Sequence, residues 1–472
     1  MTTACRVPTI GGTGSLFLAY RYVVVHWRTI ILLLILALST FLIAHAAFFE
    51  LFLFALLLIF IASQLFWIGR ILDLGERFIP GKPRRASLAI AAGLVYLFVF
   101  VYSYPQWSVG HGISASDYRL QSILIHAAFW WWLVGSILAF LLVSALGILG
   151  RAGRAAAWVY RKTRQSTHAP MAASHSAVLA GPTSPGRRQF LEQAAVLVSA
   201  TPFLAAGYGL LYERFDVEVV RQRIRLARLP KAFEGFRIAQ LSDIHLGPFT
   251  SAVYIRRCVT MTNGLKPDLI VLTGDYVAWD PEDQVEVVRL LAGLRAPDGV
   301  FGCLGNHEAY AGVEDSITRL FAAQGIRMLR QERALIRRGD ETISVIGIDD
   351  PGDKPVEEIR QLTHRRRQQL KGLLMPDTVN VLLTHYPPFF GDLELVIDLT
   401  LAGDLHGGGQ LSLDFVRPGL NLAGLLGVPY VRGLHEKNGA QLYMNRGIGI
   451  TGFPIRLGAR PEITVLELAR ET

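Results

Sequence analysis

The chain has 472 residues, too many for one ordinary domain, and its 51% hydrophobic content indicates that part of it lies in a membrane. The formal net charge of +9 is unevenly distributed: residues 1–212 carry 16 Lys/Arg and 5 Asp/Glu, whereas residues 213–472 carry 31 and 33. Because the basic excess belongs to the apolar half, where it reports membrane topology, we expect no nucleic-acid partner. Three cysteines do not make a disulfide framework.

The first long apolar stretch runs from Thr29 to Gly69. As a single helix it would be about 60 Å long, twice the thickness of a bilayer core. We therefore expect two spans joined by a turn near Ala46–Glu50. A third span is predicted over Ala86–Tyr104 and a fourth over Ser122–Leu149. Residues 1–162 would thus form a four-helix transmembrane domain.

The basic residues of this half alternate between loops. They gather in the N-terminal segment, in the loop between the second and third spans, and after the fourth span, whereas the two other loops hold only Arg119. Since Lys and Arg accumulate on the cytoplasmic side, the N-terminus and the end of the fourth span are predicted to be cytoplasmic.

Residues 163–188, rich in Ser, Ala and Pro, are predicted to be a flexible linker. Residues 189–212 then follow as a moderately apolar segment that begins next to Arg187-Arg188. The segment is similar to a twin-arginine export signal placed internally, or it is a fifth span after a plain basic stop. Both alternatives put the following half outside the cytoplasm, whereas a segment lying flat on the membrane would leave it inside.

From Arg214 onward short apolar runs alternate with helical patterns at Ala252–Asn263, Pro281–Leu294 and Val313–Gln324, which indicates an α/β domain over residues 213–472. Five runs are predicted to be strands that end next to polar motifs: residues 236–241, 268–273, 299–302, 379–384 and 397–402. In open α/β sheets ligands bind just beyond the carboxyl ends of the strands, so these five loops are expected to converge.

The five loops carry residue types that bind hard metal ions. They hold Asp243-Ile-His245, Gly274-Asp275, Gly305-Asn306-His307-Glu308, His385 and Gly403-Asp404-Leu405-His406. Taken singly, each motif also suits a turn or a helix cap. Two divalent ions about 3.5–4 Å apart require oxygen and imidazole ligands and one bridging ligand. Asp275 suits the bridge because Gly274 lets the backbone approach closely, and Glu308 is expected to orient His307.

In this order the motifs resemble those of the calcineurin-like metallophosphoesterases, over roughly residues 233–470. The tail, with Arg446-Gly447, Arg456 and Pro461-Glu462, is similar to the branch that contains membrane-associated and twin-arginine-exported bacterial members. The resemblance implies an α/β fold, a calcineurin-like four-layer β-sandwich of two mixed sheets flanked by helices. Here it would be preceded by an all-α transmembrane domain of four to five helices.

The resemblance also implies a binuclear metal centre, with Mn²⁺ expected first and Fe²⁺, Zn²⁺ or Mg²⁺ as alternatives. Asp243, His245 and His406 would bind the first ion, Asp275 would bridge, and Asn306, His385 and Asp404 would bind the second. His307 would stand near the phosphate as the catalytic residue that stabilises charge or protonates the leaving group. The family has His where this chain has Asp404, which implies either an altered metal preference or a weakened enzyme.

The sequence therefore predicts a membrane-anchored, metal-dependent phosphohydrolase that cleaves a phosphomonoester, phosphodiester or pyrophosphate by a metal-bound hydroxide. The anchor favours a lipid-linked substrate, and the expected location is the bacterial inner membrane, multi-pass, with the catalytic half on the periplasmic face. A non-catalytic metal- or phosphate-binding sensor with the same fold is the alternative. A transporter is disfavoured because the predicted spans lack paired intramembrane charges.

Overall fold

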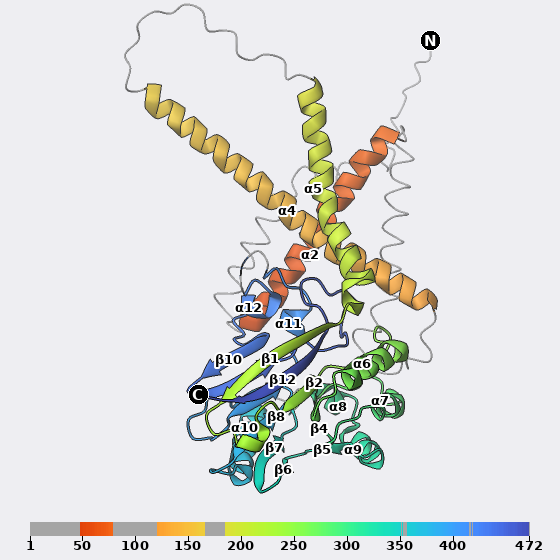
Figure 1. Ribbon diagram of the computed structural model, residues 1–472. Helices are drawn as coiled ribbons and strands as arrows, with labels where there is room; N and C mark the ends of the chain where they lie inside the picture. Colours follow the sequence, from red (N-terminus) through yellow and green to blue (C-terminus); the bar gives the residue numbers. More distant parts are fainter. Residues whose placement is uncertain are drawn as a thin grey trace, which may run out of the picture. The chain divides into compact units, whose positions relative to one another are not determined.

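The computed structural model describes residues 48–78, 120–165, 185–350, 352, 356–414, 417 and 419–471 (Figure 1). The chain divides into two compact units, one of residues 1–98 with 132–204 and one of residues 99–131 with 205–472. The span predicted to end near residue 46, the span predicted over Ala86–Tyr104 and residues 166–184 of the predicted linker lie outside the described residues.

Three long helices precede the α/β domain: α2 (Phe48–Phe78), α4 (Leu120–Gln165) and α5 (Pro185–Leu211). Helix α2 begins at the predicted turn and continues past Gly69, and α4 continues well beyond Leu149. Helix α5 covers almost all of the predicted segment 189–212 and starts with proline, whose fixed φ suits the first helical position. Each of these helices overlaps a predicted span, and α2 and α4 extend beyond it because helix-forming residues continue past the apolar stretches.

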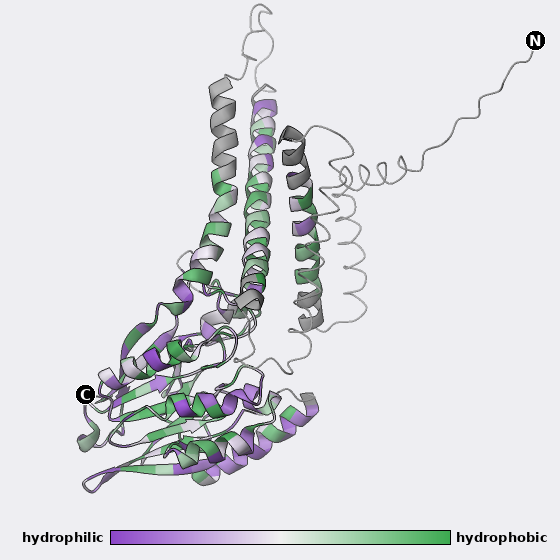
Figure 2. Ribbon diagram, turned by 90° about the vertical axis from the view of Figure 1, so that its right-hand side faces the viewer, coloured by the Kyte–Doolittle hydropathy of each residue, from purple (hydrophilic) through white to green (hydrophobic). Residues whose placement is uncertain are grey.

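One described helical stretch, Ile125–Thr163 within α4, is long and apolar enough to cross a membrane, and Phe54–Arg70 is a shorter apolar helix. Figure 2 shows that α4 is hydrophobic along most of its length and hydrophilic near its C-terminal end. Several of its large apolar side chains are exposed, among them Leu141, Leu146 and Leu149. The prediction of four to five spans stays a prediction.

Polar side chains join α2 to α4. The Gln64 amide donates to Ser136 Oγ at 3.1 Å and accepts from the Trp132 indole at 3.2 Å. The Trp67 indole donates to the Ser136 carbonyl at 2.8 Å. These bonds connect side chains that are far apart in sequence and hold the two helices together.

The α/β domain contains two six-stranded sheets. The first has the order β1-β12-β2-β3-β4-β5, with β1 (Glu218–Leu226), β12 (Glu462–Arg470), β2 (Arg237–Leu241), β3 (Leu269–Thr273), β4 (Val300–Cys303) and β5 (Arg327–Met328). The second has the order β10-β11-β9-β8-β7-β6, with β10 (Gly433–Lys437), β11 (Ala440–Met444), β9 (Leu399–Ala402), β8 (Val379–Leu383), β7 (Glu341–Gly347) and β6 (Glu332–Arg338).

Both sheets are mixed. Strands β2 to β5 run parallel, with Ile238 opposite Leu269 and Ile270 opposite Val300, whereas β12 is antiparallel to β2. In the second sheet β7, β8, β9 and β11 run parallel, and the edge strands β6 and β10 are antiparallel to their neighbours. Strands β3, β8 and β9 are buried throughout, which explains their largely apolar sequences.

Three apolar clusters define four layers. The first lies between the sheets and includes Ile238, Val271 and Val381. A second lies on the other face of the first sheet, under α6 (Ala252–Gly264), α7 (Asp283–Leu291) and α9 (Glu314–Ala323), which Figure 1 shows beside β2 to β5. A third packs Leu370 of α10 (Val356–Leu373) against Ile346 of the second sheet. The predicted two-sheet α/β fold is confirmed.

Short helices complete the domain: α8 (Asn306–Tyr310), α11 (His406–Gly409), α12 (Leu422–Leu425) and the 3₁₀ turns Glu213–Phe215 and Lys231–Phe233. The five predicted strands that lead to motifs are β2, β3, β4, β8 and β9, each within two residues of its expected bounds. Helix α7 is shorter than predicted because Asp280 Oδ1 accepts from the Glu282 amide at 2.9 Å, and this turn delays the start of the helix.

Candidate metal centre

The loops after five strands bring the predicted ligands together. Asp243 and His245 follow β2, Asp275 follows β3, and Asn306 begins α8 directly after β4. His385 follows β8 of the second sheet, and Asp404 and His406 follow β9. The site therefore lies where the carboxyl ends of strands from both sheets meet, as the sequence predicted.

Five of these residues have strained backbones. The φ angles are 52° at Asp243, 44° at His245, 59° at Asp275, 72° at Asp404 and 44° at His406. A left-handed conformation at a non-glycine residue costs on the order of 1–3 kcal/mol and persists where the surroundings enforce it, typically at functional sites. Here backbone bonds help to enforce it: the Asp243 amide donates to the Gly274 carbonyl at 3.1 Å, and the His245 amide donates to the Asp275 carbonyl at 3.0 Å.

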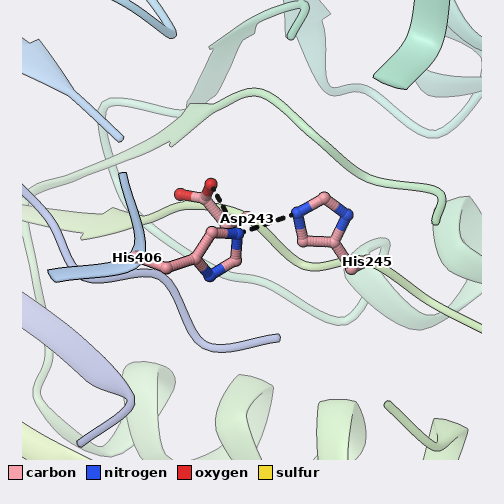
Figure 3. A group of neighbouring side chains, drawn as sticks. All are labelled: Asp243, His245 and His406. Atoms are coloured by element: carbon pink, nitrogen blue, oxygen red, sulfur yellow. Dashed lines mark hydrogen bonds and ion pairs between the residues drawn. The ribbon is translucent and has the colours of Figure 1, made fainter. Parts of the chain in front are cut away.

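Asp243, His245 and His406 form one group of buried ligand atoms (Figure 3). The Nε2 atoms of His245 and His406 lie 3.1 Å apart, and Asp243 Oδ1 lies 3.3 Å from His406 Nε2. Two imidazole nitrogens and a carboxylate oxygen that face one another in this way are a donor set for a divalent transition metal.

Asp275 connects this group to a second one. Its Oδ2 lies 3.3 Å from His245 Nε2 and 3.1 Å from His385 Nε2, and Asp243, Asp275 and His385 form another set of ligand atoms. The other oxygen, Oδ1, accepts from the His307 amide at 3.0 Å. The carboxylate is thus held on one side by backbone, while its free side faces histidines from both sheets.

The histidine at the end of β8 is oriented for ligation. His385 Nδ1 lies 2.7 Å from the Thr273 carbonyl, and because a carbonyl only accepts, Nδ1 carries the proton. Nε2 therefore faces the site. Asp404 Oδ1 lies 3.5 Å from it, and the Asp404 side chain is 27% exposed, whereas those of Asp243 and His385 are fully buried. Asp404 is thus partly open to solvent, unlike Asp243 and His385.

Several buried polar atoms at the site have no hydrogen-bond partner among the described residues: Asp243 Oδ2, Asn306 Oδ1 and His385 Nε2. The Asn306 amide nitrogen is used, since it donates to Tyr310 Oη at 3.0 Å. A buried unsatisfied polar group costs about 1–3 kcal/mol, so three in one cluster require a partner. Divalent cations satisfy carboxylate, amide and imidazole atoms together, and the residues fit such ions.

The ionisation of the cluster is strongly perturbed. Burial raises the pKa of Asp243 to about 6 and that of Asp404 to about 7. Burial lowers the pKa of His245 to about 3, so its ring is neutral at physiological pH. Burial alone would lower the pKa of His385, but the neighbouring charge of Asp275 raises it well above its usual value. A bound cation would offset the electrostatic repulsion between these closely spaced carboxylates.

Glu308 has a different role from the one predicted. Its carboxylate accepts from the amides of Gly305 at 2.8 Å, Asp275 at 3.0 Å and Tyr276 at 2.7 Å. Burial raises its pKa to about 8. The expectation that it orients His307 is wrong: the His307 ring is held by the Ala278 carbonyl at Nδ1. Glu308 instead ties the loop after β3 to the loop after β4.

Arg456 supports the site from the C-terminal tail, and sequence reasoning gave it no role. Its side chain is fully buried, and Nη2 lies 3.0 Å from His406 Nδ1. Nη1 donates to the carbonyls of Arg446 at 2.9 Å and Ala459 at 3.0 Å. This contact between the guanidinium group and Nδ1 fixes the orientation of the His406 ring. The only signal in the sequence was that Arg456 belongs to the C-terminal tail that carries the family resemblance.

Comparison with known proteins gives one family. The calcineurin-like phosphoesterase family matches residues 236–408. The chain is 30% identical over 292 residues to the uncharacterized metallophosphoesterase YkuE of Bacillus subtilis, covering 60% of this chain and 97% of that protein. It is 28% identical over 296 residues to the phosphodiesterase YaeI of Escherichia coli, covering 60% of this chain and 98% of that protein. It is 28% identical over 286 residues to a transmembrane protein with metallophosphoesterase domain of Danio rerio, covering 58% of this chain and 62% of that protein.

Proposed function

The chain belongs to the calcineurin-like phosphoesterase family, and on that basis we propose that residues 213–472 form a two-metal phosphohydrolase domain held at a membrane by residues 1–212. The chain is a metal-dependent phosphoester hydrolase. The position of Asp275 Oδ2, within 3.3 Å of histidine nitrogens from two different sheets, is the observation that favours two ions.

Each predicted ligand has a place in this proposal. Asp243, His245 and His406 would hold one ion, Asp275 would bridge, and Asn306, His385 and Asp404 would hold the other. When bound, two such ions activate water and neutralise the charge that develops on the phosphate. The residues of the chain supply the rest: Glu308 and the backbone hold the loops, and Arg456 holds His406.

His307 is the proposed catalytic side chain. Its Nδ1 is bonded to the Ala278 carbonyl, which fixes the ring with Nε2 pointing into the centre, 3.9 Å from Asp275 Oδ2. A protonated His307 can donate from Nε2 to a phosphate oxygen or to the leaving oxygen without losing its bond to Ala278. Positioned proton donors of this kind contribute on the order of 10²–10⁴ in rate.

Asp404, in place of the family's histidine, favours ions that prefer oxygen ligands. Asp404 Oδ1 and His385 Nε2 are 3.5 Å apart, so both can face one ion. Carboxylates suit Mn²⁺, Mg²⁺ and Fe²⁺, with Mn²⁺ preferred in this proposal because the imidazoles of the site suit it as well. The more exposed position of Asp404 is also the feature that favours the second candidate function, a metal- or phosphate-binding sensor without turnover.

The membrane part of the proposal has residues 1–162 as a four-helix domain, 163–188 as a linker and 189–212 as a fifth span. The apolar helix in α4 and the likeness to transmembrane relatives support it. The basic loops favour the periplasmic face of a bacterial inner membrane for the catalytic domain. A catalytic site tethered there suits a lipid-linked phosphomonoester, phosphodiester or pyrophosphate.

Assays of the detergent-solubilised full chain with Mn²⁺ against representatives of these three substrate classes test the function. Hydrolysis of at least one class, abolished by a chelator and restored by Mn²⁺, is the expected result. Binding of Mn²⁺ without hydrolysis of any of the three substrate classes would contradict the proposed hydrolase and support the metal- or phosphate-binding sensor.

A further inference from the structure

Trp279 stands beside the proposed catalytic histidine with part of its ring in solvent. It is the only tryptophan in residues 213–472. Its neighbours in the loop, Asp275 to Ala278 and Asp280, are buried, but Trp279 is 40% exposed. Its ring centroid lies 4.5 Å from that of His307. A tryptophan in a packing role is highly buried on average, so the exposed part of Trp279 is a candidate contact for a ligand.

Trp279 belongs to a cluster of rings beside the metal centre, in which the ring centroid of Tyr310 also lies 5.3 Å from that of His307. The ring centroids of His245 and His307 are 4.5 Å apart, those of His307 and Trp279 are 4.5 Å apart, and those of Trp279 and Tyr310 are 5.8 Å apart. Tyr310 is itself fixed, because its Oη accepts from the amide of Asn306. The cluster therefore reaches from His245, a proposed metal ligand, past the proposed proton donor His307 to the exposed Trp279.

We propose that Trp279, backed by Tyr310, is a stacking platform for a planar aromatic group of the substrate. The inference rests on the proposed function, in which His307 serves the leaving oxygen. A group bonded to that oxygen lies next to His307 and so within reach of the indole. The substrate is then a phosphoester whose leaving group contains a planar ring, either a nucleobase or an aryl group. Trp279 would determine specificity and take no part in proton transfer.

The geometry of the pair favours a planar ring over two other ligands. Trp279 and Tyr310 are nearly parallel, at 10°, so they present one flat wall. A quaternary ammonium group is recognised by rings that surround it at different angles, which this wall does not provide. An acyl chain gains from apolar bulk of any shape and has no need of an oriented ring. Offset stacking of a further ring on the wall is the favourable arrangement for aromatic groups.

Non-hydrolysable phosphonates test this without turnover. Phenylphosphonate and methylphosphonate have the same head group, and only the first carries a ring. Calorimetric titration of the full chain in detergent, loaded with Mn²⁺, should show that phenylphosphonate binds about 5- to 100-fold more tightly, the factor expected for one aromatic stacking contact. A nucleoside 5′-phosphonate in the same series distinguishes a nucleobase, if it binds more tightly still, from an aryl group, if it does not.

Substitutions at Trp279 separate stacking from apolar contact. Trp279→Phe should keep most of the preference for phenylphosphonate over methylphosphonate, whereas Trp279→Ala and Trp279→Leu should lose it through weaker binding of phenylphosphonate. Val253→Ala, at an exposed position on α6, is the control that should change neither. Indole emission should be quenched by phenylphosphonate in the wild type, and Trp279→Phe should lack this quenching.

Two results would overturn the platform alone: equal affinity for the two phosphonates, or full retention of the preference in Trp279→Leu. Tighter binding of phosphocholine than of phenylphosphonate would replace the planar ring with a quaternary ammonium group. Failure of both phosphonates to bind the metal-loaded protein would overturn the proposed function together with the platform, so the two failures are distinguishable.

Discussion

Asp275 and His385 meet across the two sheets, with Oδ2 of one 3.1 Å from Nε2 of the other. Asp275 follows β3 of the first sheet, and His385 follows β8 of the second. Burial alone would raise the pKa of Asp275, but the charges of His385 and His307 outweigh it and lower this pKa. Asp275 is thus a carboxylate at the junction of the sheets, where a bridging ligand is needed.

Removing the imidazole at position 307 should separate chemistry from metal binding. His307→Ala should keep both ions, because the side chain faces the phosphate position in the proposal. Loss of one partner of the transition state typically costs about 10²–10³ in rate. Esters with good leaving groups need little protonation and should lose less than alkyl esters. Steady-state kinetics with both ester types, together with metal analysis, check this; loss of an ion in His307→Ala would make the residue a ligand.

The substitution Asp404→His restores the residue that the family has at this position. It should shift the metal preference of the second site from Mn²⁺ toward Zn²⁺, because imidazole replaces a hard carboxylate oxygen. Competition between Mn²⁺ and Zn²⁺, followed by metal analysis of wild type and variant, measures the shift. Asp398→Asn, at a carboxylate that binds Arg228 away from the site, is the control. An unchanged preference in Asp404→His would mean that residue 404 is not a ligand.

Metal binding should stabilise the fold, since the buried carboxylates and the unsatisfied atoms of the site find their partners only in the loaded protein. A ligand at 100 times its dissociation constant adds about 2.7 kcal/mol to the free energy of unfolding. For a domain of this size that is a rise in Tm of roughly 5–10 °C. Thermal unfolding with a chelator and with Mn²⁺ gives the difference. The same Tm in both conditions would contradict a site built from these residues.

The topology can be tested by fusion. A reporter that is active only outside the cytoplasm, joined after Thr472, should give a signal because the basic loops place residues 213–472 on the outer face. The matched control is the same reporter joined after Gln165, at the end of α4, where no signal is expected. Signal from a cytoplasmic reporter at Thr472 would place the catalytic domain inside.

The strands and the loops that carry the proposed ligands could be predicted from the sequence because both depend on local patterns. The apolar runs that became β3 and β8 stand directly before Asp275 and His385, and parallel strands bring their carboxyl ends to one edge. The presence of Asp404 in place of the family's histidine was visible for the same reason. These features need only the order of residues along the chain.

The supporting contacts depend on packing between distant segments and could not be predicted. Arg456 is 50 residues from His406 in sequence, and nothing near it indicates that the tail folds back onto the site. Glu308 was assigned to its neighbour His307, but its carboxylate reaches the backbone after β3 instead. The ring of Trp279 is likewise placed against His307 only by the folded loops. In the N-terminal half, composition predicts spans but does not fix where a helix ends.

The most direct test of the two-metal centre is the number of ions bound by variants of Asp275 and Asn306. Mass spectrometry of metal content should find two ions per wild-type chain. Asp275→Asn should lose both, because its carboxylate faces both ligand groups, whereas Asn306→Ala should lose one. Wild-type metal content and turnover in Asp275→Asn would contradict the account.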